Sequence, residues 1–172
     1  MNRKVGLPPI ARGDARILIL GSLPGDASLS ASQYYAHPRN HFWQLVGDAI
    51  GIELVGMDYA ERVVILQSAH IALWDVVSEA DRQGSLDQKI RNVQLNELRA
   101  LADRLPYLRA IAFNGMKAAT LASGAFDELS VDILKLPSSS PAYTISMMEK
   151  AKAWAMLAHY LPPSEHRAKL AI

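Results

Sequence analysis

Short apolar runs alternate with amphipathic stretches along most of the chain. Runs typical of buried strands lie at residues 15–22, 71–77, 108–115 and 129–137. Apolar residues at helical spacing predict helices at 41–50, 58–70, 95–105, 116–124 and 145–161, the last of which Pro162 ends. Strands separated by helices favour right-handed crossovers. The pattern therefore predicts an α/β fold in which a parallel sheet carries helices on both faces.

The length of 172 residues fits one domain. At this size folding removes roughly 70% of the unfolded chain's surface from water, so one sizeable core is feasible. The sequence contains no internal repeat, linker or low-complexity segment. We expect a single domain over residues 1–172, with its core at about 14–162, and we expect the first dozen residues and those after Pro163 to be loosely held.

Composition excludes several classes of protein. The chain has no cysteine, which rules out disulfides, thiolate zinc sites, iron–sulfur clusters and cysteine nucleophiles. No apolar run approaches the ~20 residues of a membrane span, and the amino terminus lacks a signal-peptide core. We expect a cytoplasmic monomer without membrane contact. The net charge of +1 is too small to indicate a polyanionic partner, so nucleic-acid binding would need local charge.

A polar cluster follows each predicted strand. The clusters are "GSLPG" to "HPRN", "WD", "NGMK" and "LPSSSPAY". In a parallel α/β sheet the ligand crevice lies outside the carboxyl ends of the strands, so we expect these loops to converge on one cleft. Polar residues gather in loops of any fold, and convergence alone therefore favours a functional site only modestly.

Segments in these same places carry a family resemblance. The segments are "ILILGSLPG", "QYYAHPRNHFW", "LWDV", "FNGMKA" and "LPSSSPA". In that order they resemble the uracil-DNA glycosylase superfamily, specifically its DNA-deoxyinosine (hypoxanthine-DNA) glycosylase branch, over most of residues 17–144. The "AHPxNxFW" core is also similar to mismatch-specific uracil glycosylases. The resemblance implies a three-layer α/β/α sandwich with a central four-stranded parallel sheet.

The resemblance also implies an activity. It indicates a monofunctional DNA glycosylase that flips a deaminated base, hypoxanthine first and uracil second, out of DNA and hydrolyses its bond to deoxyribose. We expect no metal or organic cofactor, DNA containing a deaminated base as partner, and association with the nucleoid. Two alternatives stay open: a mismatch-specific uracil/thymine-DNA glycosylase, and a non-catalytic lesion- or nucleotide-binding protein of the same fold. Neither "GxGxxG" nor Walker spacing occurs, which disfavours a nucleotide-binding loop.

Asn40 is the expected catalytic residue, because the resemblance maps it onto the asparagine of the branch's "HPRN" motif. Many superfamily members carry an acidic or amide residue two positions before Gly25, where this chain has Leu23. An amide has no useful basicity near neutral pH, so Asn40 would orient water or stabilise the developing charge on the sugar. Alternatively, Asn40 is only the N-cap of the following helix.

Several side chains are expected to bind the base. Tyr35 maps onto the aromatic that stacks on the flipped base, although it could instead be a rim or core tyrosine, and Tyr34 could pack beneath the loop. Asp75 could accept from N1–H of hypoxanthine, donate when protonated, or cap the following loop. The rest of the expected base-binding set is Trp74, Ser22, Leu23 and Asn114, of which Asn114 could merely begin its helix.

The expected contacts to the DNA backbone lie mainly in "LPSSSPAY". Ser138, Ser139 and Ser140 offer donors to phosphates, and Pro141 stiffens the turn. His37, Arg39 and Lys117 complete the set, and Lys135 is a further source of positive charge. Pro38 keeps His37 and His41 off a shared helical face, which disfavours a metal site. The polar stretch 78–92 reads as another loop at the DNA edge.

Overall fold

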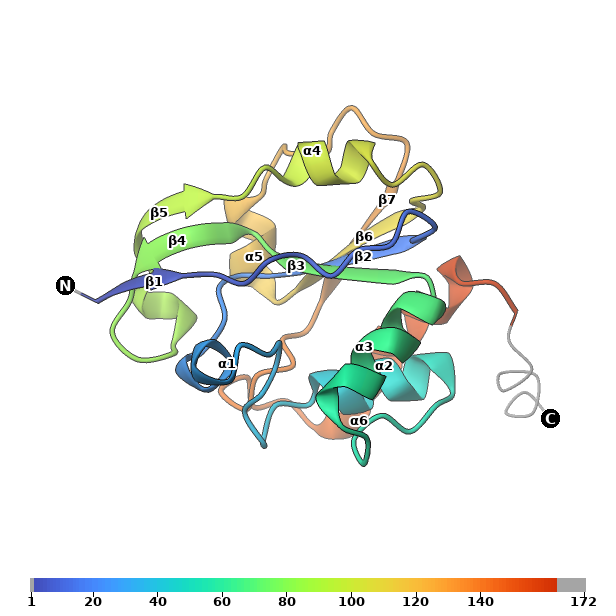
Figure 1. Cartoon of the computed structure of the whole chain (residues 1–172), viewed down its shortest axis with the longest axis horizontal. Coiled ribbons are helices and arrows are strands. Elements are labelled where there is room, and N and C mark those ends of the chain that lie inside the picture. Colours follow the sequence, from blue (N-terminus) through green and yellow to red (C-terminus); the bar gives the residue numbers. More distant parts are fainter. Residues whose placement is uncertain (1, 164–172) are drawn as a thin grey trace.

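The computed structural model describes residues 2–163, and its centre is a parallel sheet with the strand order β3-β2-β6-β7. The strands are β2 (Ile17–Gly21), β3 (Ile71–Asp75), β6 (Ala110–Asn114) and β7 (Asp132–Leu136). Helices cover both faces of this sheet (Figure 1). The predicted fold, a layered α/β/α sandwich around four parallel strands, is confirmed.

The central strands are apolar throughout because both of their faces are buried. Successive side chains of a strand point to opposite faces, and in β2 the isoleucines and leucines divide accordingly. Ile17 and Ile19 join the core beneath α2 and α6, whereas Leu18 and Leu20 join the core beneath α4 and α5. Each of the two helical layers therefore has its own hydrophobic core on one side of the sheet.

The helices begin and end where local signals place them. Their bounds are α1 (Asp26–Ala31), α2 (Phe42–Ile50), α3 (Tyr59–Ser68), α4 (Leu98–Asp103), α5 (Met116–Leu121) and α6 (Met147–Trp154). Capping boxes start α3 at Asp58 and α6 at Ser146, and Gly51 ends α2 at a φ of 76°. The last helix, predicted to continue until Pro162 ends it, changes after Trp154 to the 3₁₀ segment η2 (Ala155–Tyr160). The six-residue α1 was not predicted, because it lacks apolar periodicity.

A second, antiparallel sheet contradicts two predictions. Its order is β1-β4-β5, formed by β1 (Arg3–Val5), β4 (Val77–Asp81) and β5 (Arg91–Leu95), and a 3₁₀ turn, η1 (Asp87–Lys89), lies between β4 and β5. The stretch 78–92 is therefore a hairpin rather than a loop. The first residues are also not loosely held, because β1 pairs with β4 and Ile10 exchanges backbone hydrogen bonds of 2.8 Å with Leu73. The residues after Pro163 lie outside the described part of the chain.

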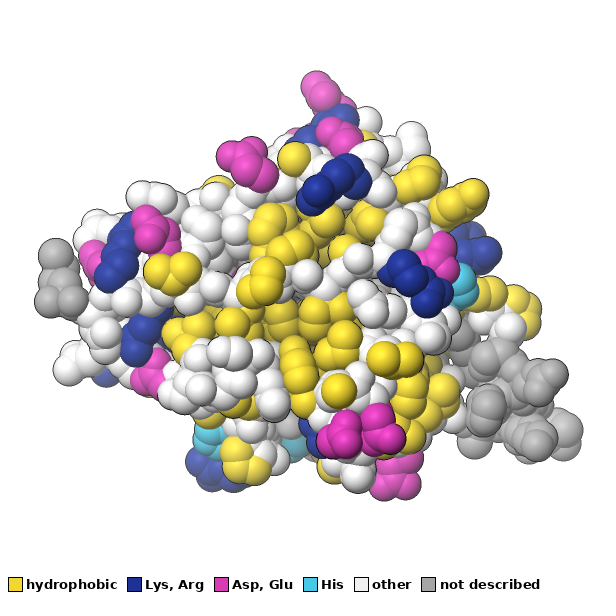
Figure 2. All heavy atoms as spheres, viewed as in Figure 1, with side chains coloured by type: hydrophobic (Ala, Val, Ile, Leu, Met, Phe, Trp, Pro, Cys, Tyr) yellow, Lys and Arg dark blue, Asp and Glu magenta, His cyan; other side chains and the backbone are white. Residues whose placement is uncertain are grey.

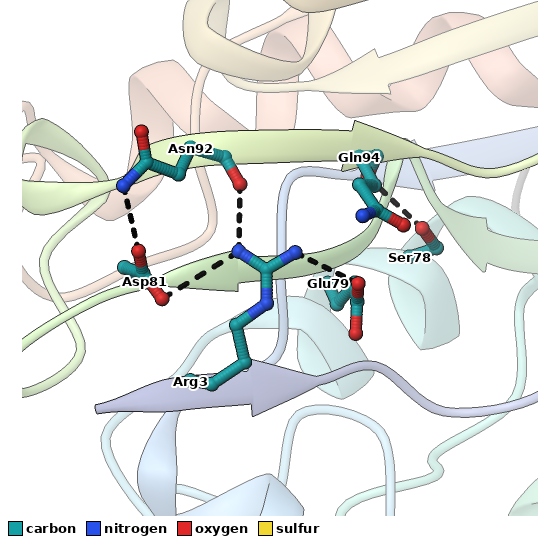
Figure 3. A network of polar contacts seen from close by, with 6 residues as sticks. All are labelled: Arg3, Ser78, Glu79, Asp81, Asn92 and Gln94. Carbon is teal, nitrogen blue, oxygen red and sulfur yellow. Dashed lines mark hydrogen bonds and ion pairs between the residues drawn. The ribbon is translucent and has the colours of Figure 1, made fainter. Parts of the chain in front are cut away.

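Arg3 connects all three strands of this second sheet on its exposed side (Figure 3). Its guanidinium donates to the Glu79 carboxylate at 2.7 Å, to Asp81 at 3.5 Å and to the backbone oxygen of Asn92 at 2.8 Å. The Asn92 amide in turn donates to Asp81 at 2.7 Å. These groups are open to solvent, so the network guides strand pairing more than it adds stability.

Arg82 joins the second sheet to the first, and it is only 2% exposed. Its guanidinium donates to Gly84 O at 2.9 Å, to Leu23 O at 3.2 Å and to Pro24 O. Two of these carbonyls belong to the loop after β2, and the third lies on the hairpin. The buried Arg82 side chain therefore fixes the hairpin against the loop after β2, which carries the segment "SLPG".

The face seen in Figures 1 and 2 is not strongly basic at its centre. Hydrophobic side chains cover the middle of this face, over the strands and the segment that follows β1, and the charged side chains lie mainly toward its periphery. A DNA backbone requires clustered Lys and Arg side chains. The centre of this face is therefore a poor candidate for DNA contact.

We predict that Arg82→Met destabilises the protein far more than Arg3→Ala. A buried carbonyl left without a donor costs about 1–3 kcal/mol, whereas exposed ion pairs contribute little. Arg82→Lys should also lose stability, because one ammonium group cannot replace a guanidinium fork. Urea denaturation measures the unfolding free energies of the three variants. If Arg3→Ala loses as much unfolding free energy as Arg82→Met, Arg82 is not the dominant contact between the hairpin and the loop after β2.

Candidate active site

The loops after the four parallel strands converge on one cavity of about 660 Å³. Nearly all residues predicted from the sequence line it: Ser22, Leu23, Tyr35, His37, Arg39, Asn40, Asp75, Asn114, Lys117, Ser138, Ser139, Ser140 and Pro141. A further wall is formed by Ser85, Leu86, Asp87 and Gln88 of the β4–β5 connection, and these residues lie in the stretch 78–92 that was expected at the DNA edge, although none of them was singled out. No motif signals this wall, since it does not follow a strand of the parallel sheet.

Trp74 is the exception, because it does not line the cavity. Neighbouring side chains in a strand point to opposite faces, and while Asp75 faces the cavity, the Trp74 indole donates to Leu7 O at 3.1 Å. A role for Trp74 in base binding is therefore not supported by its position. Tyr34 is 3% exposed and its hydroxyl donates to Pro8 O at 2.8 Å, which agrees with the packing alternative.

Tyr35 is held in an unusual backbone conformation beside the cavity. Its φ is 54°, a left-handed value that costs a non-glycine residue about 1–3 kcal/mol and persists only where the surroundings enforce it. The ring stacks on Phe42 with centroids 3.9 Å apart and planes 12° apart. The hydroxyl accepts from the Asn114 amide at 3.0 Å. Phe42 thus covers one face of the ring, and Tyr35 is half-buried at the wall of the cavity.

Asn114 ties three of the loops together. Its Nδ2 donates to the Tyr35 hydroxyl at 3.0 Å and to Ser139 Oγ at 2.9 Å, and its Oδ1 accepts from the Ser139 backbone at 2.9 Å. Next to it, Gly115 has a φ of 92°, and a Cβ there would lie 3.2 Å from the Ser138 Cβ. Both amide hydrogens of Asn114 are already used, so the geometry supports positioning of its neighbours rather than direct reading of a base.

Asp75 lies at the floor of the cavity and is only 3% exposed. Its Oδ2 is buried and has no hydrogen-bond partner among residues 2–163. Burial raises the pKa of Asp75 to about 7, the Asp87 carboxylate adds to this, and Arg82 opposes it. Gly21 permits the arrangement, because a Cβ there would lie 2.5 Å from Asp75 Oδ1 and 2.8 Å from the Tyr35 hydroxyl.

Asn40 lies just before α2, but it is not the N-cap of that helix, because the N-cap residue is His41, whose side chain makes no capping hydrogen bond. Its Oδ1 accepts from the Phe42 backbone at 3.0 Å, which fixes the amide at the start of α2. Its Nδ2 donates to no acceptor within the described chain, and the side chain lines the cavity. The helix start therefore orients the amide without using its hydrogens.

The loop after β7, which carries Ser138, Ser139 and Ser140, is held by hydrogen bonds from Asn114 and Lys150. Ser139 is 1% exposed and bonded to Asn114, so its burial does not support the predicted contact with the DNA backbone. Ser138 and Ser140 are half-buried, and their hydroxyls accept from the backbone nitrogens of Ser140 and Ala142. The buried Lys150 donates from Nζ to Ser140 O at 3.0 Å. Ser138 and Ser140 keep their hydroxyl hydrogens available at the cavity.

Positive charge is present at the rim of the cavity. His37 and Arg39 are exposed and Lys117 is half-buried, and all three line the cavity. Lys135 is exposed on β7 and does not line it. Across residues 2–163 no group of three or more His, Cys, Asp or Glu side chains could hold a metal ion. Over the same residues no helix is long and apolar enough to cross a membrane.

Comparison with known proteins relates this geometry to a family. The family model "UDG: Uracil DNA glycosylase superfamily" matches residues 8–160. A protein named "Hypoxanthine DNA glycosylase" from Methanosarcina barkeri is 38% identical over 157 residues, which is 89% of this chain and 96% of that protein. A protein of the same name from Methanosarcina acetivorans is 41% identical over 155 residues, which is 88% of this chain and 95% of that protein.

A solved structure agrees with these matches. It is a solution NMR structure of a candidate uracil DNA glycosylase from Methanosarcina acetivorans, with a TM-score of 0.83 and 38% sequence identity. The similarity covers 92% of this chain and 98% of that one. The family model spans all the segments that carry the sequence motifs. The chain belongs to the uracil DNA glycosylase superfamily.

Proposed function

We propose that this chain is a monofunctional DNA glycosylase that removes a deaminated base, hypoxanthine first and uracil second. The observation that carries the proposal is one cavity in which an oriented amide, a stacked aromatic ring and a buried carboxyl meet. These groups are Asn40, Tyr35 and Asp75. The relatives named hypoxanthine DNA glycosylase support the same activity. Action as a monomer at the nucleoid stays a prediction.

The flipped base would be held by stacking and by its edge. An enzyme that acts on a base in duplex DNA must rotate it into a pocket, where aromatic side chains and hydrogen bonds replace the contacts it had in the duplex. Tyr35, backed by Phe42, offers one ring face. Asp75 Oδ2 lacks a partner among residues 2–163, so an edge atom of the base would satisfy a buried polar atom.

Asn40 would act on the bond between base and sugar. In hydrolysis, water attacks C1′ of deoxyribose, the bonding electrons leave with the base, and the base takes up a proton. Asn40 cannot remove a proton near neutral pH, so its fixed amide would orient the water or stabilise charge at the sugar. Ser138, Ser140, His37, Arg39 and Lys117 would hold the flanking phosphates.

The direct experiment uses duplexes that contain hypoxanthine, uracil or xanthine at one position, followed by alkaline cleavage of abasic sites. We expect release of hypoxanthine fastest and uracil more slowly. Release only of uracil or thymine from mismatches would favour the mismatch-specific alternative. Binding without release of any base would favour a non-catalytic lesion sensor.

For Asn40→Ala we predict a loss of excision rate on the order of 10²–10³. Loss of the helix-start contact should cost only about 0.5–2 kcal/mol of stability, so the variant should stay folded. Asn40→Asp is the matched control, because it keeps an acceptor for the Phe42 backbone and removes the amide hydrogens. Single-turnover rates with thermal melts separate the two roles, and near wild-type excision by folded Asn40→Ala would exclude Asn40 from the mechanism.

For Tyr35→Ala we predict weaker binding of lesion DNA and slower excision, by about 5- to 150-fold, which corresponds to stacking worth ~1–3 kcal/mol. Tyr35→Phe should retain most of the DNA binding and most of the excision rate, because the ring face survives. It should lose some stability, because the Asn114 amide loses an acceptor. Fluorescence titration and single-turnover assays measure these effects, with undamaged duplex as the control. Full activity of a folded Tyr35→Ala variant would leave Tyr35 as a packing residue.

For Asp75→Asn we predict a stability gain that grows as the pH rises from about 4 to about 8. The folded state raises the pKa of Asp75 from 3.8 to about 7, so the wild type loses stability across this range while the amide does not. The gain should reach at most about 4 kcal/mol at pH 8. Melting curves test this, with the exposed Asp127→Asn as control, and a pH-independent difference would show that Asp75 titrates normally.

A further inference from the structure

The hairpin of the second sheet brings Asp87 to the cavity that the parallel sheet forms. Asp87 stands at the start of η1, and it lines the cavity together with Ser22, which lies 65 positions earlier in the chain. The Ser22 hydroxyl donates to Asp87 Oδ1 at 2.7 Å. The hairpin therefore adds a carboxyl group to the site, beside the Ser22 hydroxyl.

The segment that carries Asp87 is firmly held. Arg82 bonds it to the loop after β2, and Ser85 Oγ accepts from the Asp26 backbone at 2.9 Å. The Asp26 side chain is in turn paired with Lys4 Nζ at 2.6 Å. Contacts from three parts of the chain therefore fix the position of Asp87 before any ligand arrives.

The geometry makes Asp87 Oδ1 an acceptor, because the Ser22 hydroxyl donates to it. Three neighbouring groups favour the ionised carboxylate, although burial is the larger effect and the pKa of Asp87 is raised overall. Burial raises the pKa of Asp87, while the Ser22 hydroxyl, Arg82 and Lys117 each lower it. A carboxylate only accepts hydrogen bonds. The Ser22 hydroxyl has one hydrogen, which it gives to Asp87, so it too offers only lone pairs to a ligand.

A cavity wall that only accepts hydrogen bonds distinguishes bases by one ring nitrogen. Deaminated bases carry N–H at N1 of hypoxanthine or N3 of uracil, whereas adenine and cytosine carry a lone pair at the same nitrogen. An acceptor-only wall bonds the N–H and repels the lone pair. Asp75 alone would make this distinction poorly, because its pKa of about 7 leaves it neutral in part of the molecules near neutral pH, and a neutral carboxyl both donates and accepts and so matches either edge.

We propose that Asp87, with the Ser22 hydroxyl that it orients, is a specificity-determining residue that accepts the ring N–H of a deaminated base and rejects adenine and cytosine. The inference rests on the proposed glycosylase function. Guanine also carries N–H at N1, so this wall does not itself exclude guanine. The second sheet then serves the site by delivering this residue.

The test compares Asp87→Asn with the wild type on duplexes that carry hypoxanthine or adenine at one position. The substituted amide keeps a partner for Ser22 but can donate to the lone pair of adenine. Loss of a charged hydrogen bond worth about 1.5–3 kcal/mol should lower hypoxanthine excision by about 10- to 150-fold. The ratio of hypoxanthine to adenine affinity should fall as well, and Asp81→Asn on β4, outside the cavity, is the matched control.

The outcomes separate this inference from the proposed function. Wild-type protein that releases neither hypoxanthine nor uracil would overturn the function itself. Two outcomes would overturn only the role of Asp87, provided that the wild type releases a base. One is that Asp87→Asn keeps the wild-type excision rate and the wild-type ratio of hypoxanthine to adenine affinity. The other is that Asp87→Asn binds both duplexes more weakly by the same factor, which indicates a structural role. If Asp87→Asn does not fold, Ser22→Ala carries the same test, because it removes one acceptor and should lower the ratio less.

Discussion

The arrangement of the cavity depends on one buried amide at the end of the central strand β6. Asn114 is 7% exposed, and its hydrogen bonds reach the Tyr35 hydroxyl and both the hydroxyl and the backbone of Ser139. A buried amide that lost these partners would be left unsatisfied, which is costly in a low-dielectric interior. The end of the interior, buried strand β6 therefore positions the loops after β2 and β7, which carry groups that would contact DNA.

A second buried group, Arg82, performs the same task for the hairpin. Its guanidinium is bonded to three backbone carbonyls rather than to a carboxylate, so Asp75 and Asp87 feel its charge from a distance. That distance explains why burial still raises the pKa of both carboxyls. A direct ion pair with Arg82 would keep either carboxylate charged, and its oxygens would be bonded to the guanidinium rather than open to a ligand. The structure instead leaves both carboxyls at the cavity.

The sequence was sufficient for the parallel sheet and for most of the cavity, because buried strands such as Ile17–Gly21 are apolar on both faces and their carboxyl ends must meet. It was insufficient for β5, whose residues are mostly exposed and carry no periodic signal. Trp74 and Ser139 show a finer limit. Trp74 stands beside Asp75, which faces the cavity, and only the direction of the side chain distinguishes the two. Ser139 lines the cavity, but it is buried and bonded to Asn114. Asp87 was missed because its partner, Ser22, is far away in sequence.

The close approach of Gly21, Asp75 and Tyr35 indicates that the cavity is ordered before DNA binds. Without a Cβ at Gly21, the Asp75 carboxyl and the Tyr35 hydroxyl come close to the end of β2, and Tyr35 adopts its left-handed backbone. The stack on Phe42 and the bond from Asn114 hold the tyrosine there. Such strain is stable only when several contacts enforce it. Because the site is already ordered, the binding free energy of DNA is available to unstack and evert the base rather than to organise the protein.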